Sequence, residues 1–424
     1  MNNTLSARPI HTVFINSLLF APPFFILISN HGTGLYSLIF LLTALLCWPA
    51  ARAALRPHLG RVGGVLLAFA FCLAVALAEY LFNPEVRLRD LEKPARMMAA
   101  ACAMLTVLAL RPPRRFFWWG LIAGSVAGAG FIVYQRWGLG IERPGGLINS
   151  ITFGDISLVM GLMCLAGSLD FKRWGALWPA LGVLAGLAGS IATGTRGGLI
   201  SIVFAVVVLL KYGQLLQGRF RKGMALLALA LLASSYFIPQ TGARARIEQG
   251  VEDVRAYLDG GNTFTNVGAR LELWRGGARL VAQHPWRGSS VPEVRREMAA
   301  MVARGELPPF VLEFAHFHND ALQATVSGGV AGLLAWAGTL LLPLRFFLRQ
   351  LDAGRGGRRD AVAPALAGLL LVVSYFGFGL TEMIFWSGHS AVFYAVTLFL
   401  LVGLCLTARA DADADAAPAA GEAP

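Results

Sequence analysis

The chain has 424 residues, of which 56% are hydrophobic and only 14% are charged, and its mean hydropathy is +0.61. Soluble domains carry roughly 25% charged residues, so this composition excludes a soluble enzyme and a disordered chain. The net charge of +12 would suit nucleic acid in a soluble protein, but in a membrane protein it marks cytoplasmic loops, and no nucleic-acid partner is expected.

Twelve apolar segments are candidates for membrane-spanning helices, each of which needs about 20 mostly apolar residues. They predict an all-α polytopic membrane protein with one large helical loop. No N-terminal signal peptide is evident, so the first segment is expected to be a span. The expected spans are 12–29, 33–51, 62–82, 95–110, 116–135, 151–169, 174–192, 197–212, 223–239, 319–348, 361–382 and 388–407.

Lys and Arg residues in the short loops orient these spans. With the N-terminus in the cytoplasm, the cytoplasmic segments hold 19 basic residues and the short external loops hold 7. Basic residues concentrate on the cytoplasmic side of membrane proteins, so both termini are expected there. The predicted organisation is spans 1 to 9 in 1–239, a periplasmic loop at 240–318, spans 10 to 12 in 319–407, and a disordered cytoplasmic tail at 408–424.

The loop at 240–318 is too polar to span a membrane and too long to be a simple connection. Its apolar spacing predicts two amphipathic helices and a third helix at 292–304, so we expect a helical cap on the membrane. All ten basic residues of the loop are arginines. Most are expected to reach lipid headgroups, and two of them to grip phosphate oxygens with their planar guanidinium groups. The two expected apolar faces consist of Ile247, Val251, Val254 and Leu258, and of Leu271, Trp274, Ala278 and Val281.

Four polar elements share the external face once the spans are oriented. One of them contains Arg196, which must lie at membrane level because its loop is short. A charge there is costly, so Arg196 is either functional or a structural tie to a carboxylate or a helix C-terminus. The elements are Glu142-Arg143-Pro-Gly-Gly, Thr193-Gly-Thr-Arg196-Gly-Gly, Arg270 with Trp274, and His316-Phe-His318-Asn319-Asp320.

His318 is the candidate general base. A lone histidine is by default an ordinary hydrogen-bonded residue, but His318 begins a span among arginines. Both the helix N-terminus and the arginines disfavour the imidazolium, and a neutral imidazole can accept a proton. His316 and His318 could share a face as a metal pair, but the sequence supplies no further ligands nearby, so no metal is expected.

These elements resemble the O-antigen ligase family, within a superfamily that includes O-antigen polymerases and O-linking oligosaccharyltransferases. The family's motif is His, then Asn, Ser or Gln, nine residues, Gly, two residues, and Gly, Thr or Tyr. Here it reads His318-Asn319, nine residues, Gly329, two residues and Gly332. The layout of twelve spans with a large external loop before the histidine is also similar. Further elements that resemble the superfamily are Thr195-Arg196-Gly, Arg143 before Gly-Gly, Arg270 ahead of Trp274, and His284-Pro285-Trp286-Arg287-Gly288.

The resemblance implies a glycosyltransferase of the bacterial inner membrane. It would move O-antigen from undecaprenyl pyrophosphate to the lipid A–core oligosaccharide on the periplasmic side, among membrane lipids. The pyrophosphate leaving group needs cations and the attacking hydroxyl needs a base, so neither metal nor cofactor is expected, and direct displacement would invert the anomeric centre. The expected base is His318, the pyrophosphate-binding residues are Arg143, Arg196 and Arg270, the supporting residues are Asn319, Trp274 and Glu382, and the reserve bases are Glu313, Asp320 and Glu382.

Four alternatives stay open at this point. Glu382 could simply pair with an arginine. An O-antigen polymerase would use the same lipid-linked donor, and a relative that glycosylates proteins would usually have a longer external part after residue 390. A transporter of an anionic substrate is a different class of function, and the lack of inverted repeats and of charges at mid-membrane disfavours it.

Overall fold

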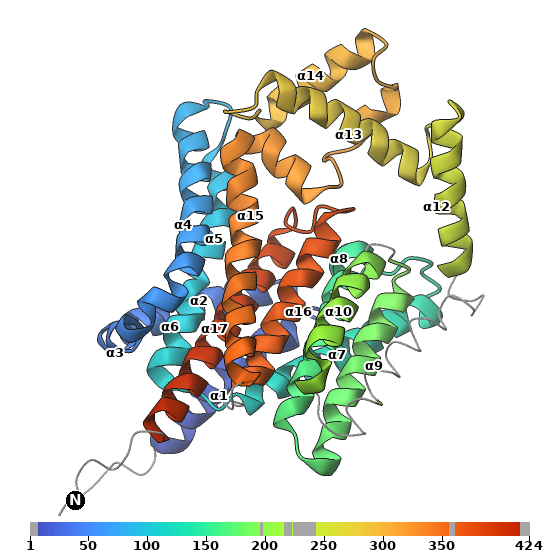
Figure 1. Ribbon diagram of the computed structural model, residues 1–424. Helices are drawn as coiled ribbons and strands as arrows, with labels where there is room; N and C mark the ends of the chain where they lie inside the picture. Colours follow the sequence, from blue (N-terminus) through green and yellow to red (C-terminus); the bar gives the residue numbers. More distant parts are fainter. Residues whose placement is uncertain (1–6, 196–197, 216–222, 224–242, 356–360, 416–424) are drawn as a thin grey trace, which may run out of the picture.

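A computed structural model describes residues 7–195, 198–215, 223, 243–355 and 361–415 of the protein, and within these ranges it contains helices and no strand (Figure 1). Apolar runs fold as helices in a bilayer because a helix satisfies its backbone polar groups within one segment. Eight helical segments of this described part are long and apolar enough to cross a membrane, and three shorter apolar helices accompany them. The predicted class, an all-α polytopic membrane protein, is confirmed.

The expected spans correspond to helices with slightly different bounds. The expected ninth span, 223–239, lies outside the described residues except for residue 223. The helices are α1 (Ala7–Phe25), α2 (Gly32–Leu46), α3 (Trp48–Leu55), α4 (Leu59–Phe82), α5 (Glu92–Ala99), α6 (Ala101–Leu110), α7 (Arg115–Val133), α8 (Ser150–Gly167), α9 (Leu177–Ala192), α10 (Gly198–Tyr212), α15 (Asp320–Arg355), α16 (Val362–Gly379) and α17 (Gly388–Asp415).

Two of the expected boundaries were wrong. The second span ends at Leu46, and Trp48–Leu55 forms the separate helix α3, which projects from the side of the bundle (Figure 1). Pro49 occupies the first turn of α3, where a proline favours a new helix. At the other end of the chain, α17 continues to Asp415, beyond the expected boundary at 407, because the alternating alanines have a high helix propensity.

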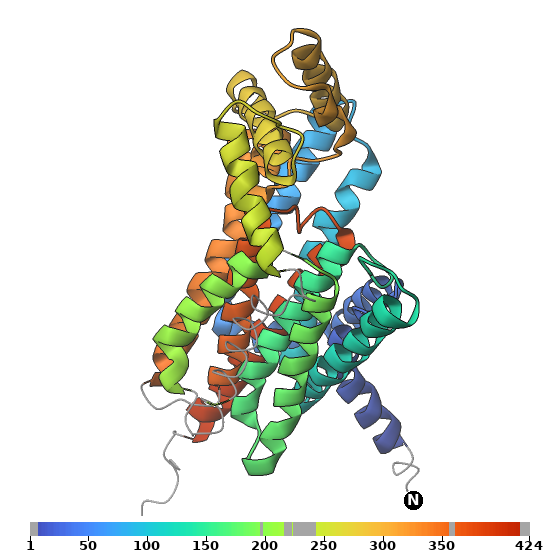
Figure 2. The ribbon, with the colours of Figure 1, turned by 90° about the vertical axis from the view of Figure 1, so that its right-hand side faces the viewer.

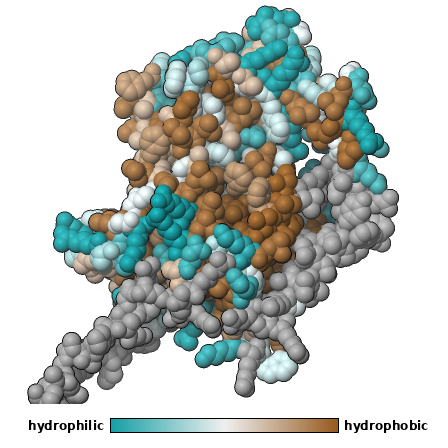
Figure 3. Space-filling model, viewed as in Figure 1, coloured by the Kyte–Doolittle hydropathy of each residue, from teal (hydrophilic) through white to brown (hydrophobic). Residues whose placement is uncertain are grey.

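The centre of the bundle is formed by α8, α16 and α17, which are almost completely buried. Glycines bring the helices close together, as where Gly186 of α9 meets Gly161 of α8. Close contact through small residues is a common way to pack helices in membranes. By contrast, large apolar side chains such as Leu67 and Leu210 are exposed on the outer helices. Figure 3 shows hydrophobic side chains across the middle of the molecule and hydrophilic ones over the upper end.

The upper end is a helical cap, which we define as α12 (Ala243–Leu258), α13 (Asn266–Gln283) and α14 (Val291–Ala303) (Figures 1 and 2). All three expected helices are present, but burial does not follow their expected apolar faces. On α12, Val251, Val254 and Leu258 are exposed. On α13, Ala278 is exposed, and the buried face instead contains Leu273, Leu280 and a pair of glycines. The glycines, Gly276 and Gly277, let Met298, Leu307, Phe317 and Leu322 approach the helix backbone.

The long helix α15 bends close to its start, at Gly328 and Gly329, where the backbone leaves the helical conformation. Two backbone hydrogen bonds tie this bend to the loop that follows α13. The amide of Ser289 donates to the carbonyl of Val326 at 2.7 Å, and the amide of Val330 donates to that of Pro285 at 2.9 Å. The bend thus fixes the cap to the membrane helices next to the predicted histidine motif.

Candidate active site

A cavity of about 790 Å³, hereafter the first cavity, lies between the cap and the ends of α8 and α10. Its lining brings together segments far apart in the sequence. It includes four of the residues singled out in the sequence, namely Arg143, Arg270, His318 and Glu382. The first turn of α13 also lines it with Asn266, Ala269 and Arg270. Two amides of this turn are occupied, because that of Val267 donates to Asp253 at 3.4 Å and that of Gly268 donates to Thr265 at 3.0 Å. The two arginines are therefore the groups of this lining that suit an anion.

His318 is held in an unusual backbone conformation immediately before α15. Its φ angle is +48°, in the left-handed region that side chains other than glycine seldom adopt. Its neighbours fix it on both sides. The indole Nε1 of Trp274 donates to the carbonyl of Phe317 at 2.8 Å, and the side-chain amide of Asn319 donates to the carbonyl of Leu380 at 3.0 Å. Asn319 also accepts a hydrogen bond from the amide of Leu322 at 2.9 Å, which caps α15.

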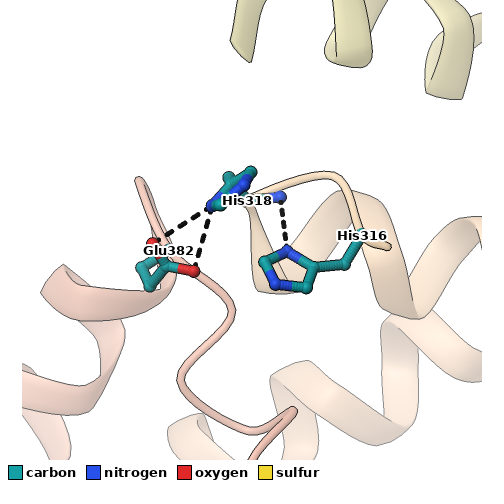
Figure 4. Close-up of side chains that lie close together, drawn as sticks. All are labelled: His316, His318 and Glu382. Atoms are coloured by element: carbon teal, nitrogen blue, oxygen red, sulfur yellow. Dashed lines mark hydrogen bonds and ion pairs between the residues drawn. The ribbon is translucent and has the colours of Figure 1, made fainter. Parts of the chain in front are cut away.

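The carboxylate of Glu382 faces the imidazole of His318 (Figure 4). Both carboxylate oxygens lie 3.1 Å from Nδ1, and both side chains are mostly buried, with exposures of 19% for His318 and 11% for Glu382. A carboxylate only accepts hydrogen bonds, so Nδ1 carries the hydrogen. The lone pair of the neutral ring therefore lies on Nε2, which leaves that nitrogen able to accept a proton.

The environment of Glu382 favours its ionised form. Burial opposes ionisation, but the hydrogen bonds from His318 and from the amide of Met383, at 3.1 Å, outweigh it and hold the pKa of Glu382 below its usual value. A guanidinium nitrogen of Arg270 also lies 3.9 Å from this carboxylate. Both interactions considered for Glu382, with the histidine and with an arginine, thus occur in one cluster.

His316 stacks beside His318, with ring centroids 4.3 Å apart. Its Nδ1 accepts a hydrogen bond from the backbone amide of His318 at 3.4 Å (Figure 4). Burial and the neighbouring His318 ring lower the pKa of His316, so it is neutral at pH 7 and keeps the lone pair that this bond requires. His316 thereby helps to hold the backbone of His318.

The same three side chains could also hold a metal ion. The ligand atoms of His316, His318 and Glu382 lie within 4.8 Å of one another. The expectation that the histidine pair lacks a further ligand nearby was wrong. Glu382 is 64 residues away from His318 in the sequence, but the fold brings its carboxylate next to the two histidines. However, Nδ1 of His318 already donates to Glu382 and Nδ1 of His316 already accepts from an amide. A metal bound through these atoms would have to break both hydrogen bonds.

The other predicted site residues have different surroundings. Arg143 is exposed in the loop before α8 and lines the first cavity. Arg196 lies outside the described residues, although Gly194 of the same turn lines the cavity. Of the reserve bases, Glu313 is exposed outside the cavity lining, and Asp320 is buried beneath it, where the amide of Phe385 donates to the carboxylate at 3.4 Å.

The glycines of the histidine motif shape the bend of α15. Gly329 has a φ angle of +58°, and a Cβ atom there would collide with the carbonyl oxygens of Pro285 and Trp286. A Cβ atom on Gly332 would collide with the carbonyl of Ala324. Gly329 therefore allows the loop at Pro285 and Trp286 to pack against the bend of α15. This contact holds the cap above His318, which explains why the motif contains both the histidine and the glycine.

Comparisons with known proteins agree with this geometry. Residues 181–337, which include the histidine motif and most of the cap, match the family model described as O-antigen ligase. The predicted resemblance to the O-antigen ligase family is confirmed. An O-antigen ligase of Escherichia coli is 26% identical over 202 residues, which cover 47% of this chain and 45% of that protein. An uncharacterised protein of Haemophilus influenzae is 20% identical over 337 residues, 78% of this chain and 83% of that protein.

The similarity to the O-antigen ligase family fits the apolar helices and the site. The chain is a multi-pass membrane protein, and the family supports a glycosyltransferase of the ligase and polymerase type that acts on lipid-linked glycans. The matched region contains Arg270, Trp274, His318 and Asn319. Arg143 and Glu382 lie outside it, and the fold brings them to the same cavity.

Proposed function

We propose that this protein is an O-antigen ligase that transfers a glycan from undecaprenyl pyrophosphate to the lipid A–core oligosaccharide. One observation carries the proposal: a histidine oriented by a carboxylate lines the same cavity as Arg143 and Arg270. A base for a hydroxyl and cations for a pyrophosphate are the two requirements of this transfer. The E. coli relative named O-antigen ligase gives further support.

In the proposed mechanism, Nε2 of His318 takes the proton of an acceptor hydroxyl as that oxygen attacks the anomeric carbon of the donor. The bond between this carbon and the pyrophosphate oxygen breaks, and the pyrophosphate leaves with the electron pair. Arg143, Arg196 and Arg270 hold its charge. Glu382 stabilises the imidazolium as it forms. The single displacement inverts the anomeric centre and uses neither metal nor cofactor.

We also propose the orientation that the basic residues predict, with the cap in the periplasm and both termini in the cytoplasm. The chain would then lie in the bacterial inner membrane with its active site on the periplasmic side. A cysteine introduced by Asp259→Cys, on the exposed end of α12, tests this. A membrane-impermeant maleimide should label it in spheroplasts above the background of the native cysteines, and labelling that requires lysis would reverse the orientation.

The decisive experiment is a transfer assay with purified protein, lipid-linked donor and lipid A–core, in the presence of EDTA. His318→Ala should lower kcat by about 10²- to 10⁴-fold, the usual contribution of a general base, while donor binding stays unchanged. His31→Ala, at an exposed histidine before α2, is the matched control and should keep full activity.

Other outcomes would redirect the proposal. Transfer that survives His318→Ala would remove His318 as the base. Transfer that EDTA abolishes would favour a metal held by His316, His318 and Glu382. Extension of a second lipid-linked repeat, with no transfer to lipid A–core, would identify a polymerase instead.

A further inference from the structure

A second cavity, of about 650 Å³, lies on the other side of α15 from the first. Its walls are the end of α4, the loop at 83–86, the start of α14 and the bend of α15 (Figure 1). Trp286 lines it with a side chain that is 78% exposed. An exposed indole offers a flat apolar face and a hydrogen-bond donor, a combination that suits the face and the hydroxyls of a sugar ring.

The second cavity has an excess of acidic groups, with four acidic and two basic side chains in its lining. Both basic groups are paired, Arg296 with Glu85 at 2.8 Å and Arg287 with Glu293 at 2.8 Å. Glu79 forms no side-chain hydrogen bond or ion pair within the described part of the chain. Carboxylates accept hydrogen bonds from hydroxyls and repel phosphates, so this cavity suits an uncharged, hydroxyl-rich ligand and disfavours a pyrophosphate.

A third cavity, of about 130 Å³, shares lining residues with both cavities and is hereafter called the passage. It runs between α14 and the segment that precedes His318, and His316 and Trp386 line it. It shares Phe314 with the first cavity. The residues that it shares with the second cavity are Ser289, Val291 and Ser327.

We propose that the second cavity is the acceptor subsite, which binds an uncharged stretch of oligosaccharide and directs its terminal sugar through the passage to His318. This inference rests on the proposed function. The lipid-linked donor occupies the first cavity, where Arg143 and Arg270 bind its pyrophosphate. The acceptor glycan lies against Trp286 and Glu79. The two substrates therefore approach from opposite sides of α15, and the acidic lining of the second cavity disfavours the pyrophosphate of the donor.

Steady-state transfer assays test this assignment with the variants Trp286→Ala and Glu79→Gln. Each should raise the KM for lipid A–core by about tenfold, which corresponds to about 1.4 kcal/mol, and leave the KM for the lipid-linked donor unchanged. Trp174→Ala is the matched control, because Trp174 is 82% exposed and lines neither of these cavities. A thermal midpoint equal to that of the unsubstituted protein shows that each variant is folded.

Direct binding separates this inference from the proposed function. The core oligosaccharide, released from lipid A–core by mild acid, should bind the unsubstituted protein in calorimetry and lose about tenfold in affinity with Trp286→Ala. An active enzyme whose acceptor KM and oligosaccharide affinity do not change in either variant would overturn the subsite. A raised donor KM would overturn it too. Protein that binds the oligosaccharide through Trp286 but transfers nothing would keep the subsite and refute the ligase activity.

Discussion

Replacing Glu382 with glutamine is the sharpest test of the proposed chemistry, because it keeps the shape of the side chain and removes its charge. The carboxylate lies 3.1 Å from Nδ1 of His318. Two unit charges about 4 Å apart interact by roughly 4 kcal/mol at an effective dielectric constant of about 20. Partial exposure of both side chains weakens this, so we take roughly 2 to 4 kcal/mol as the loss in stabilising the imidazolium of the transition state. Glu382→Gln should then lower kcat by roughly 30- to 1,000-fold.

The assay is transfer to lipid A–core at saturating donor and acceptor, with donor affinity measured separately. Glu252→Gln, at an exposed carboxylate on α12, is the matched control. The pKa of Glu382 is depressed, so its charge is present above its usual value of 4.5 and is lost only as pH falls through the lowered pKa. Ionisation of Glu382 itself should therefore contribute no change to the ratio of the two enzymes' kcat values above about pH 4.5. A kcat within threefold of the unsubstituted enzyme would refute the role given to Glu382.

Three further predictions concern donor binding, the bend of α15 and the attachment of the cap. Arg270→Lys should weaken donor binding about tenfold, since a lysine cannot grip two phosphate oxygens at once; an unchanged donor Kd would remove Arg270 from the pyrophosphate site. Gly329→Ala should lower the thermal midpoint by several degrees, because the residue has a positive φ and its new Cβ atom would collide with backbone atoms. Gly338→Ala is the control and should leave the midpoint unchanged, because a Cβ atom there makes an ordinary contact. Equal midpoints for the two variants would contradict this prediction. Hydrogen bonding to Arg296 lowers the pKa of Glu85, so their ion pair should persist above pH 4.5 and break as pH falls through the lowered pKa. Glu85→Gln should therefore reduce hydrogen-exchange protection of α14 at pH 7, and unchanged protection would show that the pair does not hold the cap.

The sequence predicted the helical class and the motif because both depend on local information. The length of an apolar segment is enough to indicate a membrane span, and the motif is recognised from the spacing between His318 and Gly329 in the sequence. The partner of His318 was harder to predict, since Glu382 is distant in the chain and only the return of α16 brings it close. Glu382 was among the supporting residues and reserve bases, but its position beside Nδ1 could not be inferred from spacing.

The burial pattern of the cap could not be predicted from hydropathy either. Ala278 belongs to the expected apolar face of α13, but it is exposed. In the structure, the glycine pair at 276 and 277 decides which face is buried, because neighbouring side chains can approach the backbone only there. The second cavity could not be predicted from the sequence for a similar reason, since its acidic groups come from segment 79–90 and from α14, which are about two hundred residues apart.

The position of α13 over the first cavity couples the placement of Arg270 to the support of His318. Arg270, which lines the first cavity, and Trp274, which donates to the carbonyl of Phe317, lie about one helical turn apart on this helix. A rigid helix cannot move one without the other. If the cap lifts, Arg270 leaves the cavity and His318 loses the support of its backbone at the same time.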